Sequence, residues 1–269
     1  ETVKIDGREM PFSMVMLTSP VSAVAEAYRR LRANLQFARP DDTISMLTVT
    51  GPSQGDGKTT TSTNLALAMA RAGQRTLLID ADLRRPQLHT YLGLDRSPGL
   101  AEALYDESVL AEEDAMATDI DDLSVLTAGG EMPNPSEVLG SQRMGRFLDR
   151  LEERFDFVVV DTPPLLLFSD PVSVVTHTDG ALVVVEANKS DRSAVTQALS
   201  LLEDVGSTPI GTVMNRFDPD RARSYGYGYG YGYGYGYGYG YGSQYGSLQE
   251  YYEEEEKRSS GGPLSFLRG

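Results

Sequence analysis

Cysteine and tryptophan are absent from the 269 residues, and histidine occurs only twice. Without cysteine the chain has no disulfide, no thiol nucleophile and no cysteine ligand for zinc. His89 and His177 lack the HExxH spacing of a zinc helix, so a transition-metal centre is not expected. A magnesium site built from carboxylate, hydroxyl and phosphate oxygens needs neither residue type and stays open.

Long apolar runs are absent as well. No segment reaches the roughly 18–20 apolar residues that span a bilayer, and no signal peptide is recognisable. The chain begins with Glu1 rather than Met. We therefore expect it to be the cytoplasmic part of a longer protein. Whether membrane segments precede it is left open by the sequence.

Basic residues are scarce relative to acidic ones, at 24 Lys and Arg against 39 Asp and Glu, for a formal net charge of −15. The acidity belongs to residues 1–216, which carry 32 acidic and 19 basic side chains, a net charge of −13. Nine of these carboxylates lie between Glu102 and Asp122, a stretch without Lys or Arg that we interpret as a solvated acidic loop. Such a field opposes nonspecific binding to nucleic acid, so no nucleic-acid partner is expected.

What the chain does contain is a series of short, β-rich apolar runs separated by helix-length segments. Several of the runs lack alternation between apolar and polar residues, as expected for strands that are buried on both faces of a parallel sheet. The pattern predicts an α/β fold with a doubly wound, mostly parallel sheet flanked by helices. The predicted strands are Met46–Thr50, Thr76–Ile79, Leu123–Thr127, Phe157–Val160, Ala181–Val185 and Gly211–Met214.

Three helices are predicted with defined ends. An amphipathic helix at Ser22–Phe37 precedes the first strand, Lys58–Ala72 is ended by Gly73, and Glu137–Phe155 places its apolar residues on one side. The apolar periodicity stops near Phe217. We therefore predict one domain over residues 1–217 and a flexible Tyr/Gly-rich tail over residues 218–269.

The stretch GPSQGDGKTT follows a predicted strand and opens a predicted helix, which is the context of a phosphate-binding loop. Glycines allow the backbone amides to surround phosphate groups, and the helix N-terminus adds partial positive charge. Lys58 is expected to reach the terminal phosphates and the Thr59 hydroxyl to bind Mg²⁺. The strict GxxxxGK[ST] pattern is not met, because Pro52 takes the place of its first glycine. The expected nucleotide-binding residues of the loop are Gly55, Asp56, Gly57, Lys58, Thr59 and Thr60.

Two further apolar strands end in carboxylates. TLLIDADLRRP delivers Asp80 and Asp82 on the same side of a strand end, and FDFVVVDTPP delivers Asp161 as in a Walker B element. The carboxyl ends of neighbouring parallel strands meet where ligands bind in such sheets. Beside a phosphate loop, these carboxylates can hold Mg²⁺ or accept a proton from an attacking hydroxyl.

Four motifs together resemble the bacterial tyrosine kinases, and the resemblance runs from about Ser22 to the tail: GPSQGDGKTT, LLIDADLRRP, GGEMPNPSEVL and VVVDTPP. It implies a P-loop NTPase fold, ATP and Mg²⁺ as cofactors, and Lys58 as a catalytic residue. It also implies that Asp80, Asp82 and Asp161 share magnesium coordination, together with Thr59, and activation of the tyrosine hydroxyl; which aspartate is the base stays open. The partition-type ATPases related to this family carry a signature lysine where this chain has Ser53, which counts against that class.

Two sites beyond the loop are predicted with open alternatives. Asn215 ends a strand where related folds recognise the nucleotide base, although a simple strand-end turn is equally compatible with it. In EAYRRLR, the residues Glu26, Arg29 and Arg32 lie three apart near one helix face, which by itself predicts a weak ion pair. By resemblance, this ExxRxxR helix, at residues 22–38, joins subunits into a ring.

The tail holds twelve of the fifteen tyrosines, most of them alternating with glycine. Half-glycine strands are weak, so a mobile segment is expected. By resemblance, the tyrosine cluster is phosphorylated in the active site of a neighbouring subunit. The predicted sites are Tyr225, Tyr227, Tyr229, Tyr231, Tyr233, Tyr235, Tyr237, Tyr239, Tyr241, Tyr245, Tyr251 and Tyr252.

The leading hypothesis is therefore an ATP-dependent protein-tyrosine autokinase that acts in trans within a homo-oligomeric ring. The resemblance further implies regulation of surface polysaccharide synthesis and export, a transmembrane activator or polysaccharide co-polymerase segment as partner, a protein-tyrosine phosphatase, and a cytoplasmic place at the inner face of the membrane. Two other hypotheses stay open: a deviant-Walker ATPase that acts as a nucleotide-dependent dimerisation switch, and a Gly-Tyr adhesive segment carried by an inert domain.

Overall fold

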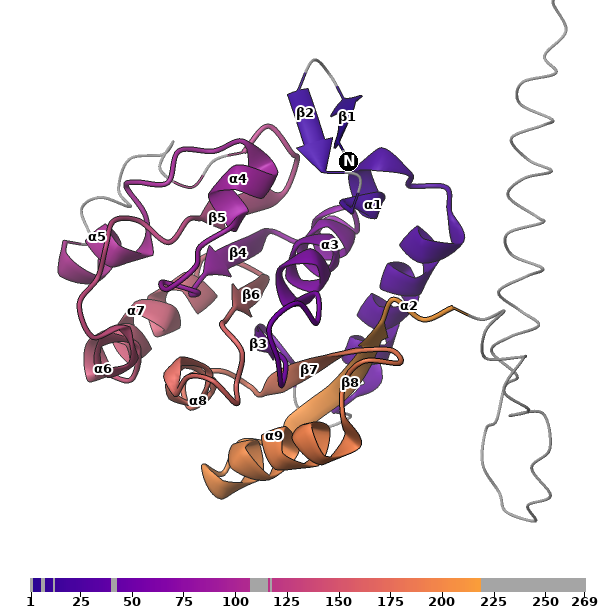
Figure 1. Ribbon diagram of the computed structural model, residues 1–269. Helices are drawn as coiled ribbons and strands as arrows, with labels where there is room; N and C mark the ends of the chain where they lie inside the picture. The colour runs from indigo at the N-terminus through magenta and orange to yellow at the C-terminus, as the bar shows by residue number, and fades with distance from the viewer. Residues whose placement is uncertain are drawn as a thin grey trace, which may run out of the picture.

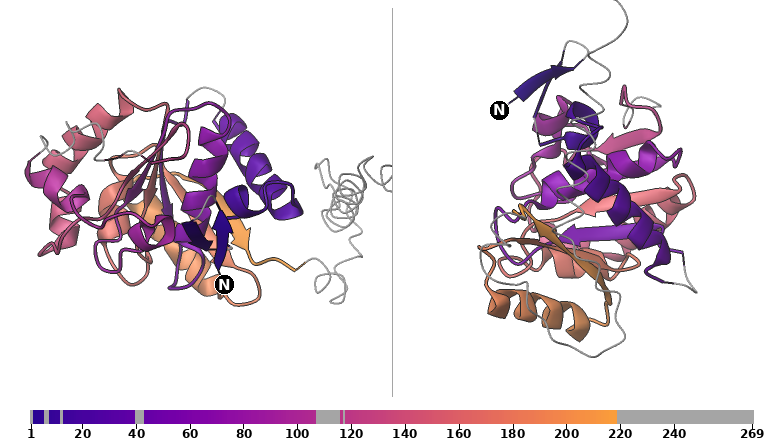
Figure 2. Two further views of the ribbon diagram at one scale, coloured as in Figure 1. Left: turned by 90° about the horizontal axis from the view of Figure 1, so that it is seen from above. Right: turned by 90° about the vertical axis from the view of Figure 1, so that its right-hand side faces the viewer.

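The computed structural model describes residues 2–5, 8–11, 13–39, 43–106, 116 and 118–218. The tyrosine-rich tail from residue 219 onward and much of the predicted acidic loop lie outside the described residues. The described chain forms a central sheet with helices on both faces (Figure 1; Figure 2).

The central sheet has six strands in the order β5-β4-β6-β3-β7-β8, and every neighbouring pair is parallel. All residues of β3, β4 and β6 are buried, and apart from Thr48 and residues at the strand ends they are apolar, as expected for strands covered on both faces. The predicted fold class is thus confirmed, and each predicted strand is present to within two residues. The strands are β3 Met46–Thr50, β4 Thr76–Asp80, β5 Leu123–Leu126, β6 Phe157–Asp161, β7 Ala181–Glu186 and β8 Pro209–Asn215.

Alternate residues of the strands feed separate hydrophobic cores on the two faces of the sheet. Helices α1–α4 pack with Val49, Val159 and Val184 on one face. Helices α5–α8 pack on the other face, and α9 joins α8 there against β7. A two-stranded hairpin of β1 Thr2–Ile5 and β2 Arg8–Pro11 precedes this domain. The helices are α1 Val15–Thr18, α2 Ala23–Phe37, α3 Lys58–Ala70, α4 Leu88–Leu92, α5 Leu100–Tyr105, α6 Pro135–Leu139, α7 Gln142–Glu152, α8 Asp170–Val175 and α9 Arg192–Asp204.

Two of the three predicted helices are confirmed. Ser22 caps α2 by accepting a hydrogen bond from the amide of Ala25 at 3.1 Å. Helix α3 ends two residues earlier than predicted, and Gly73 adopts the left-handed φ of +79° that favours glycine after a helix.

The predicted single helix Glu137–Phe155 is wrong. The chain forms two helices there, α6 and α7, and the break lies at Gly140 and Ser141. The Ser141 hydroxyl accepts the amide of Met144 at 3.2 Å and so starts a new helix. The apolar residues of both helices still pack into the same core, which is why their periodicity looked continuous. Helix α9, whose N-cap is Asp191, was not predicted.

Candidate active site

The loop between β3 and α3 has glycines at positions where a side chain would be strained or would collide with a neighbour. Gly55 and Gly57 have φ of +86° and +92°. A Cβ atom on Gly57 would lie 1.9 Å from Nδ2 of Asn215, and one on Gly51 would lie 2.4 Å from the carbonyl oxygen of Val184. The backbone therefore turns tightly at the N-terminus of α3, and phosphate can approach the amides directly.

Lys58 crosses this loop and is only 8% exposed. Its Nζ donates to the carbonyl oxygen of Ser53 at 3.1 Å, and the amide of Ser53 donates to Oδ2 of Asp56 at 2.7 Å. Burial lowers the pKa of the Lys58 ammonium, while the charge of Asp161 acts in the opposite direction. The loop thus presents a poorly solvated cation, which strengthens its attraction for phosphate oxygens.

Asp161 connects β6 to the first turns of α3. It is 1% exposed and accepts hydrogen bonds from the hydroxyl of Thr59 at 2.7 Å and of Ser62 at 2.8 Å. Burial raises the pKa of Asp161 to about 6, although both hydroxyls favour its charged form. Thr60, the next predicted loop residue, also lies in this first turn and is partly buried.

Asp80 is the register partner of Asp161 on the adjacent strand. Its Oδ2 accepts the amides of Gln87 and Leu88, both at 3.1 Å, and its Oδ1 accepts the amide of Asp82 at 3.2 Å. Burial, followed by the charge of Asp161, raises the pKa of Asp80 to about 8. Asp80 is therefore already engaged in holding the turn that leads to α4.

Asp82 is the least buried of the three predicted aspartates and lies beyond the end of β4. Its Oδ1 accepts the amide of Arg85 at 2.9 Å. Burial raises the pKa of Asp82, whereas the charge of Lys58 is among the influences that lower it. The backbone amide of Arg84 is a further donor to the Asp82 carboxylate, which remains partly exposed.

The donor set is compatible with nucleotide and magnesium. Gly55 and Gly57 give the loop the positive φ angles of a tight turn at the N-terminus of α3, and the Thr59 hydroxyl next to Asp161 matches the oxygen ligands that Mg²⁺ prefers. Within the described ranges, no three His, Cys, Asp or Glu side chains form a metal cluster by themselves. A magnesium ion would therefore take phosphate oxygens as further ligands, and the predicted protein ligand set stays a prediction: Thr59, Asp80, Asp82 and Asp161.

Asn215 lies against the loop rather than apart from it. Its Nδ2 donates to the carbonyl oxygen of Asp56 at 3.0 Å, and its Oδ1 accepts the amide of Arg216 at 2.9 Å. Both amide atoms therefore bond to the backbone, and Asn215 supports the turn at Gly57. Recognition of the base by Asn215 stays a prediction.

A buried ion pair next to the site was not foreseen. Asp170 is 1% exposed. Its carboxylate accepts a hydrogen bond from Nε of Arg84 at 2.8 Å and another from the hydroxyl of Ser136 at 3.0 Å. The Arg84 guanidinium also lies 4.4 Å from the ring centroid of Phe168. This cluster ties the segment after β4 to α6 and α8. Arg84 follows the acidic motif in sequence, but nothing local indicated that Asp170 is its partner.

The predicted assembly residues lie on α2. Glu26 and Arg29 form the expected ion pair at 2.9 Å, and Arg30 approaches Glu26 at 3.9 Å. They are partly exposed, and Arg29 and Arg32 lie close to Arg71, the C-cap of α3 at the end away from the loop, so they are no part of this chain's own active site. The predicted phosphorylation sites, Tyr225–Tyr252, lie outside the described residues.

Comparisons with known proteins agree with this geometry. A family model described as an AAA domain matches residues 43–211. The chain is 33% identical to the putative tyrosine-protein kinase CapB of Staphylococcus aureus over 206 residues, which cover 77% of this chain and 90% of that protein. It is 34% identical to the tyrosine-protein kinase YwqD of Bacillus subtilis over 220 residues, which cover 82% of this chain and 92% of that protein.

A solved structure has the same architecture. The kinase domain of the Escherichia coli tyrosine kinase ETK superposes with a TM-score of 0.69 at 31% identity, covering 82% of this chain and 84% of that one. No described helix of the present chain is long and apolar enough to cross a membrane. The glycine loop, the buried Lys58 and the Thr59–Asp161 bond thus occur in a chain that belongs to the bacterial tyrosine kinases, protein-tyrosine kinases built on the nucleotide-binding P-loop ATPase fold.

Proposed function

We propose that this chain is an ATP-dependent autokinase that phosphorylates the tyrosines of its own C-terminal tail. The observation that carries the proposal is the convergence of Lys58, Thr59 and Asp161 at the glycine loop, with Asp82 next to them. A twelve-tyrosine tail on the same chain supplies the acceptor.

The loop and Lys58 hold the nucleotide. The backbone amides at the N-terminus of α3 and the Lys58 ammonium bind the phosphate oxygens, and Thr59 with Asp161 positions the metal. When bound, Mg²⁺-ATP supplies the transferable phosphoryl group. Fixed positive groups in a buried site stabilise the charge that spreads over the group during transfer, because water does not screen them there.

Asp82 is the carboxylate that we assign as proton acceptor. A tyrosine hydroxyl has a pKa of about 10 and must lose its proton as its oxygen attacks. Asp80 and Asp161 are each only 1% exposed and are held by three backbone amides and two hydroxyls, respectively, whereas Asp82 is held by backbone amides alone and is more exposed. The phenolic proton moves to Asp82, the tyrosine oxygen bonds to the γ-phosphorus, and the bond from that phosphorus to the β-phosphate oxygen breaks to release ADP.

Transfer between subunits explains the repetitive tail. A tail held in a ring of identical chains meets the neighbouring site at high effective concentration, so little sequence recognition is needed. Glycine after most tyrosines leaves the backbone free to present each hydroxyl in turn. We assign Glu26, Arg29 and Arg32 of α2 to the contacts between subunits.

The wider role follows from family membership. We propose that the kinase regulates synthesis and export of a surface polysaccharide from the inner face of the cell membrane. Its partners would be a transmembrane activator segment and a protein-tyrosine phosphatase. Phosphate added by the chain and removed by the phosphatase would switch the assembly.

The test is incubation of the full chain with ATP and Mg²⁺, followed by mass spectrometry of the tail. We expect phosphotyrosine within Tyr225–Tyr252, its loss in Lys58→Met, and its retention in Arg192→Met, which removes an exposed cation on α9. Hydrolysis of ATP without phosphotyrosine would overturn the proposal in favour of a nucleotide-dependent switch. Neither hydrolysis nor phosphotyrosine would favour the adhesive tail.

A further inference from the structure

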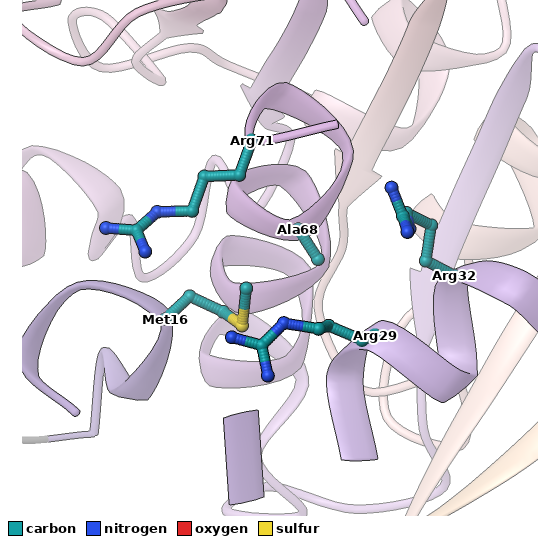
Figure 3. Close-up of a pocket in the computed structure, with 5 residues that line it drawn as sticks. All are labelled: Met16, Arg29, Arg32, Ala68 and Arg71. Carbon is teal, nitrogen blue, oxygen red and sulfur yellow. The ribbon is translucent and has the colours of Figure 1, made fainter. Parts of the chain in front are cut away.

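A polar cavity lies at the opposite end of α3 from the phosphate loop. It has a volume of about 410 Å³ and is lined by Met16, Arg29, Arg32, Ala68 and Arg71 (Figure 3). Arg71 is the C-cap of α3, thirteen residues after Lys58. At 1.5 Å per residue, the two ends of that helix are about 20 Å apart. The cavity is therefore separate from the nucleotide site.

The three arginines bring together unneutralised positive charge. Arg29 is paired with Glu26 at 2.9 Å and also donates to the carbonyl oxygen of Pro20. Neither Arg32 nor Arg71 forms an ion pair with any described residue. Within the same part of the chain, the buried Nε of Arg32 also lacks a hydrogen-bond partner. Such a donor is costly to bury unless a water or a ligand satisfies it.

The remaining lining is apolar. Met16 and Ala68 are buried beneath the arginines. In Figure 3, Arg29 and Arg71 reach toward the space above Met16, and Arg32 stands on the other side of Ala68. An aromatic ring can stack on the planar guanidinium groups that cover Met16 and Ala68. Guanidinium groups bind phosphate through paired, charge-assisted hydrogen bonds.

We propose that this cavity, the arginine pocket, binds a phosphotyrosine of the tail. The inference rests on the proposed autokinase function, which generates that ligand. A phosphotyrosine combines the two features that the pocket matches, an aromatic ring and a group with about −1.5 to −2 charges. The three arginines and Glu26 leave a formal charge of +2 in a chain whose net charge is −15, so the pocket is complementary in charge to a phosphate group.

Chain length allows a tail to reach the pocket of its own or another subunit. Tyr225 follows the last described residue, Asp218, by seven residues, and Tyr252 follows it by 34. At 3.3–3.6 Å per residue, an extended segment of these lengths reaches up to about 25 Å and about 120 Å. Because Arg29 and Arg32 are also the proposed assembly residues, a bound phosphate would compete with a neighbouring subunit for them. Phosphorylation would then loosen the ring through a specific site.

The test measures binding of a fluorescent Gly-Tyr repeat peptide that carries one phosphotyrosine. Its fluorescence anisotropy is followed as the full chain is added. The chain is first treated with a phosphatase, and ATP is left out. We expect Arg71→Ala to weaken binding about tenfold or more, as loss of a charge-assisted hydrogen bond implies. Arg71→Lys should be intermediate because it keeps the charge but loses the fork. Arg192→Ala, which removes an exposed arginine of α9, is the matched control and should bind as the unsubstituted chain does.

Circular dichroism establishes that each variant is folded. Equal binding by Arg71→Ala and the unsubstituted chain, or no binding at all, would overturn the proposal. The acidic, unphosphorylated peptide of residues 250–256 is tested as a competitor. If it displaced the fluorescent peptide as well as an unlabelled phosphotyrosine peptide does, the proposal would also be overturned, because the pocket would then be a carboxylate site. The fluorescent peptide is already phosphorylated when it is added, so binding does not depend on the kinase activity of the chain. Absence of binding would therefore leave the autokinase proposal standing. Conversely, absence of tail phosphorylation would leave a positive binding result standing.

Discussion

Replacement of Gly57 by alanine tests the geometry of the phosphate loop. The backbone of Gly57 has φ of +92°, and a Cβ atom there would lie 1.9 Å from Nδ2 of Asn215. The left-handed conformation costs alanine about 1–2 kcal/mol. Displacing Asn215 also breaks its 3.0 Å hydrogen bond to Asp56, worth about 1 kcal/mol. We therefore expect Gly57→Ala to lower the free energy of unfolding by about 2–3 kcal/mol.

Gly73→Ala provides a matched control for that substitution. Gly73 has φ of +79°, but nothing lies within 4 Å of a Cβ placed there. It should therefore show only the conformational cost, about 1–2 kcal/mol. It should also bind nucleotide normally, whereas Gly57→Ala should bind a fluorescent ATP analogue more weakly because its loop is displaced.

A double-mutant cycle isolates the collision. In the unsubstituted chain, Asn215→Ala should lower the free energy of unfolding by about 1 kcal/mol. In the Gly57→Ala chain it should lower it much less, because the hydrogen bond of Asn215 is already lost there and removal of the side chain relieves the collision. Urea unfolding of the four proteins gives the coupling energy. Equal stability and equal nucleotide affinity of Gly57→Ala and Gly73→Ala, or additive effects in the cycle, would refute the close contact between Asn215 and the loop.

The remaining predictions concern charge. The pKa of Asp80 is about 8 in the folded chain, above its ordinary value of 3.8, so the folded state binds a proton that the unfolded state has lost between about pH 4 and 8. The free energy of unfolding without nucleotide should consequently fall as the pH rises through that window. Asp80→Asn should make this fall less steep, as measured by urea unfolding at pH 5, 7 and 9. An unchanged slope would contradict the raised pKa of Asp80. Arg84→Ala should lower the free energy of unfolding by about 3 kcal/mol, because it leaves the buried carboxylate of Asp170 without its cation; the loss is at the low end for a buried pair because Arg84 is 34% exposed. Asp170→Asn should recover part of that loss in thermal or urea unfolding. Additive effects of the two substitutions would argue against the pair. Tail phosphorylation should separate assembled subunits, because each phosphate adds about −1.5 to −2 charges to a chain at −15. Light scattering before and after ATP and Mg²⁺ measures this, and an unchanged oligomer would rule out the switch.

Local sequence was sufficient for much of the fold and for the centre of the site. The buried strands are mostly apolar, and the glycine loop, Lys58 and Thr59 are adjacent in the chain, so their spacing alone predicts a phosphate site. Asp161 was predicted because it follows an apolar strand. The tail tyrosines and their repetition are likewise known from the sequence alone.

Contacts between distant segments were decided only by the tertiary structure. Strand order places β6 between β4 and β3, which makes Asp80 the neighbour of Asp161, and no local pattern encodes that order. The same holds for Asn215 against Gly57, for Asp170 with Arg84, and for the arginine pocket, in which Arg71 of α3 joins two residues of α2. Periodicity reports which side of an element is apolar, whereas the partner of a buried polar group depends on how the elements pack. The sequence therefore determined the chemistry that is available, and the packing determined which of these groups act together.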